Sequence, residues 1–218
     1  MTAAPLRGAD LSGMQFIFAS HKHSDHLDPG TLPDLMAASP QAQLVLPLAL
    51  VEHATSLGLP QERFRPTRGN ETFRLGPLTV HSLPAAHPDF DDTPEHGYPF
   101  LSFVFEVDGM RFYHSGDTLA YLGLAERLRA FQLDVAFLPI NGTDERRAAL
   151  HVPPNMNSDE ALALARLAGV ARVIPHHYDM FTFNTMNVNT FTQQAKALGQ
   201  PHFVLHPGER FVLTGRRR

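Results

Sequence analysis

A six-residue stretch near the N-terminus gathers four side chains that can bind metal ions. It follows the apolar run at 15–19 and consists of His21, Lys22, His23, Ser24, Asp25 and His26. The apolar run predicts a buried strand, so Ser20 begins the loop that leaves it, and functional residues concentrate on loops held by rigid elements. Because imidazole and carboxylate groups together suit zinc, iron or manganese, the stretch predicts a metal site.

The spacing of these side chains favours two ions. Side chains alternate along an extended chain, so His21 and His23 point to the same side and can bind one ion. Asp25 and His26 come where residues 27–30 turn the chain, and they can face a second ion. The alternative is a polar surface loop that happens to be rich in histidine. That explanation suits a lone histidine better than this combination.

The stretch resembles the signature of the metallo-β-lactamase superfamily of hydrolases, which lies at the mouth of a β-sandwich. The resemblance implies three further ligands, each after a later strand. His87, Asp117 and His177 each follow an apolar segment in the required order. The family's Pro-x-His pattern selects His177 over His176, and Gly116 permits a sharp exit from the strand before Asp117.

Three segments resemble more closely the branch that includes L-ascorbate 6-phosphate lactonase. They are 113–117, 133–136 with Gly142, and 173–175 with His177 and Asp179, within a match from about Ala9 to about His206. The resemblance implies an α/β fold, the αββα sandwich of the superfamily. It also implies a metal-dependent hydrolase that cleaves a lactone or ester bond of a small, anionic, sugar-phosphate-like molecule.

The same resemblance implies a set of seven ligands for two divalent metal ions, with zinc or manganese expected and iron as a further candidate. His21, His23 and His87 would bind one ion, Asp25, His26 and His177 the other, and Asp117 would bridge them. A water shared by the ions would lose a proton near neutral pH and attack the substrate. Asp25 and Asp117 are therefore the expected catalytic residues.

Four other residues are candidates for substrate binding. Arg146 aligns with an arginine of the lactonase branch and could clamp a phosphate or carboxylate, although a solvated charged loop is the commoner explanation. Asn141 and Tyr178 flank the expected ligand loops and can line the same cleft. His114 could orient a ligand through a hydrogen bond, and a buried structural histidine is the alternative.

The composition describes one ordinary globular domain. With 218 residues, 43% of them hydrophobic and 18% charged, residues 1–218 are expected to form a single domain. The absence of cysteine means that metal ligands must offer nitrogen or oxygen. A net charge of -4 argues against a nucleic-acid partner. No transmembrane or signal segment stands out, so we expect a cytoplasmic protein without membrane contact.

Hydrophobic periodicity predicts two packed sheets with helices outside them. Helices are expected at 31–38, 47–57, 118–131, 159–167 and 188–198, and strands at 15–19, 44–46, 73–75, 78–83, 100–107, 110–114, 135–140, 171–175, 203–205 and 211–213. In the helix at 118–131 the expected core positions are Leu119, Leu122, Leu128 and Phe131. Asn157 or Ser158 can cap the helix at 159–167.

The start of the chain is short for this branch. Only 15 residues precede Phe16, where members of the branch carry several strands, and a sheet without them has an uncovered edge. There are three explanations: the natural chain is longer, a partner subunit covers the edge, or the sandwich is reduced. We favour the first, in which the start of the given sequence is shortened. A non-catalytic truncated homologue is therefore the second hypothesis, and a phosphodiesterase the third. The resemblance also permits homo-oligomers.

Overall fold

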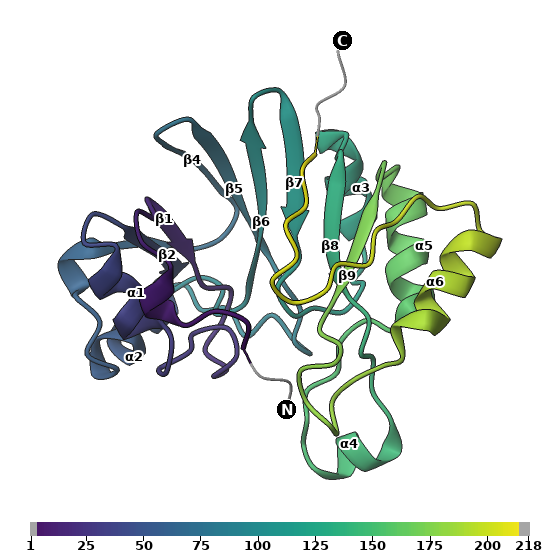
Figure 1. Cartoon of the computed structure of the whole chain (residues 1–218), viewed down its shortest axis with the longest axis horizontal. Coiled ribbons are helices and arrows are strands. Elements are labelled where there is room, and N and C mark those ends of the chain that lie inside the picture. Colours follow the sequence, from purple (N-terminus) through teal and green to yellow (C-terminus); the bar gives the residue numbers. More distant parts are fainter. Residues whose placement is uncertain (1–3, 214–218) are drawn as a thin grey trace.

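The computed structural model describes residues 4–213 and places two β-sheets between two layers of helices (Figure 1). The first sheet contains β1 (Phe16–Phe18), β2 (Gln43–Pro47) and β3 (Phe64–Thr67), and the second contains β4 (Glu71–Leu75), β5 (Leu78–Pro84), β6 (Leu101–Val107), β7 (Met110–His114), β8 (Val135–Pro139) and β9 (Val173–His176). The helices are α1 (Leu32–Ala38), α2 (Val51–Ser56), α3 (Leu124–Phe131), α4 (Glu145–Ala149), α5 (Ser158–Ala168) and α6 (Val188–Ala197), with short 3₁₀ turns η1 (Gly8–Asp10), η2 (Leu48–Leu50) and η3 (Gln61–Arg63).

The two sheets differ in the direction of their strands. In the first sheet β1, β2 and β3 run parallel and lie in that order, and the helices α1 and α2 fall in the connections between them. In the second sheet β4 to β7 form an antiparallel meander, and β8 and β9 then add in parallel. The turn between β6 and β7 contains Asp108 and Gly109, both with positive φ, which is the tight hairpin expected from that pair.

Three clusters of apolar side chains fill the spaces between the four layers of helices and sheets. Helices α1 and α2 pack on the first sheet around Ile17, Leu44 and Leu46. The core of the second sheet's outer face contains residues of α3, α5 and α6, together with the fully buried ring of Tyr113. A smaller cluster, which includes Val45, lies between the sheets. The four layers in the order helix, sheet, sheet, helix are therefore each held by burial of apolar area.

Several expected elements differ from those in the structure. The helix expected at 118–131 begins only at Leu124, after Gly123 with φ +88°, so Leu122 lies before it and is fully exposed. Strand β3 was not predicted, because Pro66 inside it argues against a strand. Residues 203–213, expected to hold two strands, contain neither. The segment around Arg146 is the short helix α4, not a long loop.

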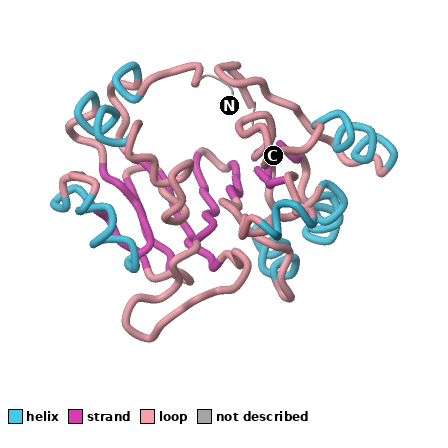
Figure 2. The backbone as a smooth tube through the Cα atoms, turned by 90° about the horizontal axis from the view of Figure 1, so that it is seen from below, coloured by secondary structure: helices cyan, strands magenta, loops and turns pink. Residues whose placement is uncertain are grey.

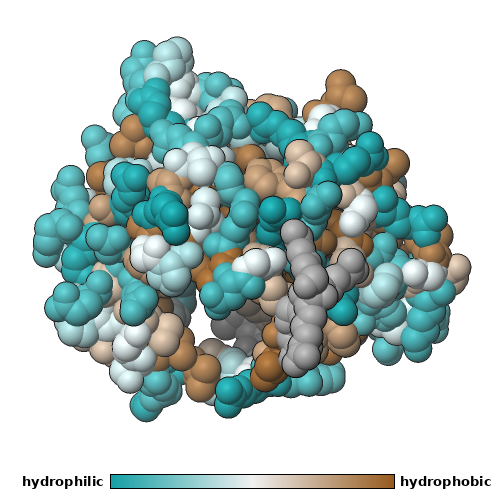
Figure 3. Space-filling model, turned by 90° about the horizontal axis from the view of Figure 1, so that it is seen from above, coloured by the Kyte–Doolittle hydropathy of each residue, from teal (hydrophilic) through white to brown (hydrophobic). Residues whose placement is uncertain are grey.

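The loops that carry the predicted ligands gather at one end of the molecule. Seen from below, the loops lie across the ends of the strands, with helices on both flanks (Figure 2). Among residues 4–213, β1 is the one strand that precedes the histidine-rich loop, as the sequence indicated. The opposite end, seen in Figure 3, mixes hydrophilic and hydrophobic side chains around a hollow. No helix of the described part has the length and apolar character needed to cross a bilayer.

Helix α5 is fixed by its cap, and the cap leads to a prediction about stability. Asn157 Oδ1 accepts a hydrogen bond of 3.0 Å from the Glu160 amide, and Glu160 Oε2 accepts one of 2.9 Å from the Asn157 amide. Replacing Asn157 by alanine is expected to lower the free energy of unfolding by about 1 kcal/mol, because it leaves a helix amide without its partner.

Urea unfolding of Asn157→Ala measures this change. Asn189→Ala, on the exposed surface of α6, is the control and should change the free energy of unfolding by less than about 0.5 kcal/mol. Equal midpoints for Asn157→Ala and the unaltered protein would contradict the role of the cap.

Candidate metal centre

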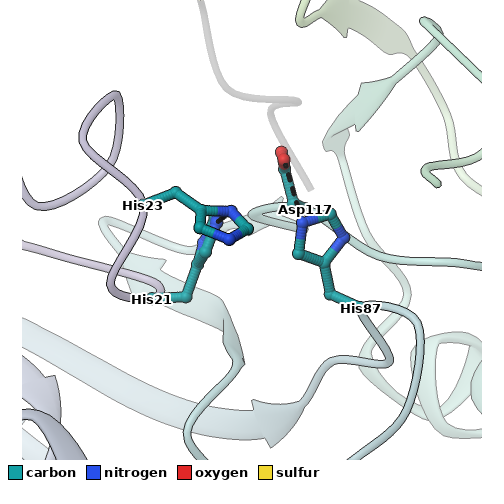
Figure 4. Close-up of side chains that lie close together, drawn as sticks. All are labelled: His21, His23, His87 and Asp117. Atoms are coloured by element: carbon teal, nitrogen blue, oxygen red, sulfur yellow. Dashed lines mark hydrogen bonds and ion pairs between the residues drawn. The ribbon is translucent and has the colours of Figure 1, made fainter. Parts of the chain in front are cut away.

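All seven predicted ligands meet at the end of the sandwich where the loops gather. The ligating atoms of His21, His23, His87 and Asp117 lie within 4.8 Å of one another, and those of Asp25, His26 and His177 form a second such group. We call these the first and second ligand groups. The three imidazole rings of the first group lie together beside the carboxylate of Asp117 (Figure 4).

The first ligand group is the more buried of the two. Within this group, Nε2 of His21 lies 2.8 Å from Nδ1 of His23. His87 Nε2 lies 3.6 Å from Asp117 Oδ2. Burial lowers the pKa values of His21 and His23, and it lowers the pKa of His87 to about 4. These imidazoles are therefore neutral at pH 7, which is the form that binds a metal ion.

His87 is oriented with one nitrogen free for a metal ion. Its Nδ1 lies 3.2 Å from the carbonyl oxygen of Pro154. A carbonyl only accepts, so Nδ1 carries the proton and the neutral ring has a lone pair on Nε2. That Nε2 is buried and has no hydrogen-bond partner among the described residues. A buried acceptor without a partner is costly, so the residues of this group fit a divalent cation.

Asp117 lies between the two ligand groups. Its Oδ2 is 3.2 Å from Nε2 of His177, and its Oδ1 is 3.3 Å from Nε2 of His26. Asp25 Oδ2 lies 3.5 Å from Nε2 of His177 and 3.6 Å from Nε2 of His26. The Asp117 carboxylate thus faces histidines of both groups, including His87.

In the metal-free protein a proton occupies the second ligand group. Burial acts to lower the pKa of His177, but hydrogen bonds to Asp117 and Asp25 outweigh it and raise that pKa to about 10. Burial also acts to raise the pKa of Asp117, and the neighbouring His177 and His26 more than reverse this, so the carboxylate stays ionised. The His177 imidazolium holds positive charge where a metal ion would place it.

Metal uptake by the second ligand group is therefore expected to depend on pH. A metal ion must displace the proton of His177, so binding near neutral pH should release at least this one proton and strengthen as pH rises toward 10. Isothermal titration calorimetry with zinc at one pH, in buffers of different ionisation enthalpy, counts the protons released. A heat independent of the buffer, or an affinity that falls as pH rises, would show that His177 is not displaced.

Ser20 links the two ligand groups through one hydroxyl. The buried Ser20 Oγ lies 3.0 Å from Nδ1 of His21 and 3.0 Å from Nδ1 of His26. Both rings thereby turn Nε2 toward the ligand groups. Gly116 permits this arrangement, because its φ is +57° and a Cβ at that position would lie 2.7 Å from Cβ of Ser20. The loop that carries Asp117 can therefore approach Ser20 closely.

Replacing Ser20 by alanine is expected to weaken metal binding by about 10 to 100-fold, because partners that orient ligating histidines have effects of this size. Competition with a chromophoric chelator measures the affinity. Ser24, also a serine of the histidine-rich loop but exposed, provides the control Ser24→Ala, for which no change is expected. Unchanged affinity in Ser20→Ala would exclude the orienting role.

His177 and the adjacent His176 have separate environments. The His176 ring stacks on His114 with centroids 4.9 Å apart, and its Nε2 lies 3.1 Å from Ser115 Oγ. His177 has φ +60°, a left-handed conformation that is uncommon outside glycine. This turn of the chain sends the His177 ring toward Asp117, so the residue selected from the Pro-x-His pattern is the one that joins the second ligand group.

The four residues predicted to bind substrate are in different places. Tyr178 and His114 line a cavity beside the second ligand group, and the Tyr178 hydroxyl donates to the carbonyl of Leu205. Asn141 is buried and its amide donates to Asn184 Oδ1. Arg146 is exposed on α4 and does not line that cavity.

The sequence did not indicate the residues that orient the ligands. Ser20 was identified only as the start of a loop, and Pro154 not at all. Pro154 contacts His87 through a backbone carbonyl across 67 positions of sequence, a relation that no local pattern records. Ser20 could have been found, because it immediately precedes the first histidine of the stretch.

Known proteins resemble this chain over most of its length. Residues 1–178 match the family model described as the beta-lactamase superfamily domain. The chain is 27% identical over 201 residues to a UPF0173 metal-dependent hydrolase of Carboxydothermus hydrogenoformans, covering 91% of this chain and 81% of that protein. A relative from Pyrobaculum aerophilum with the same description is 27% identical over 195 residues, covering 88% and 78%.

Solved structures share the fold at lower sequence identity. A metallo hydrolase from the archaeon Ignicoccus hospitalis superposes with a TM-score of 0.71 and 23% identity, covering 89% of this chain and 77% of that one. An isothiocyanate hydrolase from Delia radicum gut bacteria gives a TM-score of 0.76 at 17% identity, covering 98% and 82%. The two packed sheets with outer helices are thus the metallo-β-lactamase fold, and the chain belongs to the beta-lactamase superfamily domain family.

Proposed function

We propose that this protein is a metal-dependent hydrolase that uses a dinuclear centre to cleave a lactone or ester bond of a small molecule. The observation that carries the proposal is the position of Asp117, whose two carboxylate oxygens face histidines of both ligand groups. The relatives from Carboxydothermus hydrogenoformans and Pyrobaculum aerophilum are described as metal-dependent hydrolases, which supports the same class of reaction here.

The donor set agrees with the proposed cofactor. Five imidazoles and two carboxylates offer nitrogen and oxygen, a combination that accepts zinc, manganese or iron. Cations in these positions would supply a hydroxide near neutral pH and polarise the carbonyl oxygen of a substrate. Such chemistry requires no serine or cysteine nucleophile.

The residues of the chain would divide the work of holding and orienting the centre. Asp117 would fix the distance between the first and second ligand groups, because its carboxylate faces histidines of both. Pro154 fixes the tautomer of His87, and Ser20 orients His21 and His26. Ligands must be positioned to within about 0.5 Å for catalysis, and these buried contacts provide rigidity of that kind.

The anionic substrate expected from the sequence has less support. It followed from the resemblance to the lactonase branch, with Arg146 as the candidate clamp, and Arg146 is exposed on α4 and lines neither of the two described cavities beside Asp25 and His26. The proposed function therefore includes the lactone or ester bond but not a phosphate group on the substrate.

Metal analysis combined with an activity screen tests the proposal. Protein purified without added metal, and protein reconstituted with zinc or manganese, would be assayed on lactones, nitrophenyl esters and a nitrophenyl phosphodiester. Two ions per chain with turnover of esters or lactones is the expected result. Turnover of the phosphodiester alone would replace the proposed function by a phosphodiesterase, and protein without metal after reconstitution would favour a non-catalytic homologue.

A further inference from the structure

A cavity of 480 Å³ adjoins the second ligand group. Asp25, His26 and His177 form part of its wall. Apolar groups from distant parts of the sequence form much of the rest: Pro5 near the N-terminus, Met180 after β9, and Pro207 near the C-terminus. Small-molecule sites occupy about 300–1,000 Å³ and are mostly apolar, so this rim cavity has the size of a ligand site.

A second cavity of 240 Å³ opens from the same ligands toward the space between the sheets. It shares Asp25, His26 and His114 with the rim cavity. The rings of Phe18, Phe103 and Phe105 line it. The ring of Phe18 contacts Phe103 and Phe105 edge to face, with centroids 5.3 and 4.8 Å apart, and the rings of Phe103 and Phe105 stack. We call it the aromatic cavity.

The described residues that line the two cavities include no lysine or arginine. The carboxylates in the walls are Asp25 and Asp179. Apart from the ligand groups themselves, these walls therefore offer a negative group on a substrate no lysine or arginine to pair with, and they place it near two carboxylates. An apolar group in the same place would instead gain from burial against proline, methionine and phenylalanine.

The loop at the edge of the rim cavity is also apolar. Met180 and Phe183 are 36% and 47% exposed, and the ring of Phe181 lies between them in sequence and contacts Phe183. This loop follows His177 directly in sequence, and its Met180 lines the rim cavity beside the second ligand group. A substrate entering there would meet an apolar surface.

We propose that the substrate is neutral away from its scissile bond and carries an apolar acyl or aryl group, which the rim and aromatic cavities accommodate. The inference rests on the proposed function in placing the scissile carbonyl at the two ligand groups. It names the substrate class that the residues around that centre would accept.

A pair of uncleaved amides tests the inference without relying on turnover. N-methylhexanamide and the mono-N-methylamide of adipic acid have the same chain length and differ in a terminal methyl or carboxylate. Ligand-observed NMR titration of the zinc-loaded protein is expected to show tighter binding of the neutral amide by about 10-fold or more, as apolar pockets discriminate on this scale.

Two matched lysine variants and one alanine variant test whether the rim cavity causes the preference for the neutral amide. Met180→Lys introduces a cation into the wall of the rim cavity and is expected to reduce the preference for the neutral amide by about 10-fold, through attraction of the carboxylate and loss of apolar area. Leu122→Lys makes the same kind of change at a fully exposed residue outside both cavities and should leave the preference unaltered. Met180→Ala removes apolar area without charge and should weaken binding of the neutral amide alone.

The outcomes distinguish a failure of this inference from a failure of the proposed function. Equal or tighter binding of the carboxylate, binding of neither amide, or equal effects of Met180→Lys and Leu122→Lys would overturn the inference. Nitrophenyl hexanoate, measured in parallel, reports on the proposed function. Failure to cleave this ester while the neutral amide binds preferentially would remove the proposed function and leave the apolar site intact.

Discussion

Replacing Asp117 by alanine is expected to remove metal and activity together, with kcat/KM reduced by more than about 100-fold. Residues that only orient ligands have effects up to that size, and Asp117 faces both ligand groups directly. In the metal-free state the substitution also leaves the His177 imidazolium with Asp25 as its remaining carboxylate neighbour. Elemental analysis and hydrolysis of a nitrophenyl ester measure the two losses.

The conservative variant and a distant control separate this effect from misfolding. Asp117→Asn keeps the shape of the side chain and removes the charge, so it should fold and still lose metal. Asp159→Ala, in the exposed first turn of α5, should retain both ions and full turnover. Full activity in Asp117→Ala would contradict the assignment of Asp117 as the shared ligand.

Two adjacent histidines give the second large prediction. His177→Ala is expected to lose one of two metal ions and about 100-fold or more in kcat/KM, because Nε2 of His177 lies between Asp25 and Asp117. His176→Ala should retain both ions, since that ring stacks on His114 and contacts Ser115.

His176→Ala is the matched control for His177→Ala. Both variants remove an imidazole from neighbouring positions at the end of β9, so a general disturbance of the loop would affect both alike. Metal content by mass spectrometry after dialysis is the measurement. Loss of an ion from His176→Ala with two ions retained in His177→Ala would reverse the assignment.

Residue types and spacing predicted a metal site at the stretch from His21 to His26, and the resemblance to the superfamily added His87, Asp117 and His177 after later strands. The fold brings the loops that carry these seven residues to one end. The prediction of the site's position succeeded because the ends of neighbouring strands lie close together at the same edge of a sheet. The information lies in local sequence, where strand exits and ligand types can both be identified.

Contacts between distant residues could not be predicted in the same way. Arg146 was selected as an anion clamp, yet the adjacent Arg147 is the buried one, and it donates to Asp144 and to the Asn141 carbonyl. Neighbours on a helix point to different sides, and sequence does not say which side faces the core. Leu122 was expected inside on the same kind of pattern and is exposed, because Gly123 delays the start of α3.

Anomalous diffraction from crystals grown with zinc tests the central claim most directly. We predict two anomalous peaks per chain, one about 2.1 Å from nitrogen atoms of the first ligand group and one at a similar distance from nitrogen atoms of the second, with Asp117 bound to both. A single peak, or peaks away from Asp117, would contradict it.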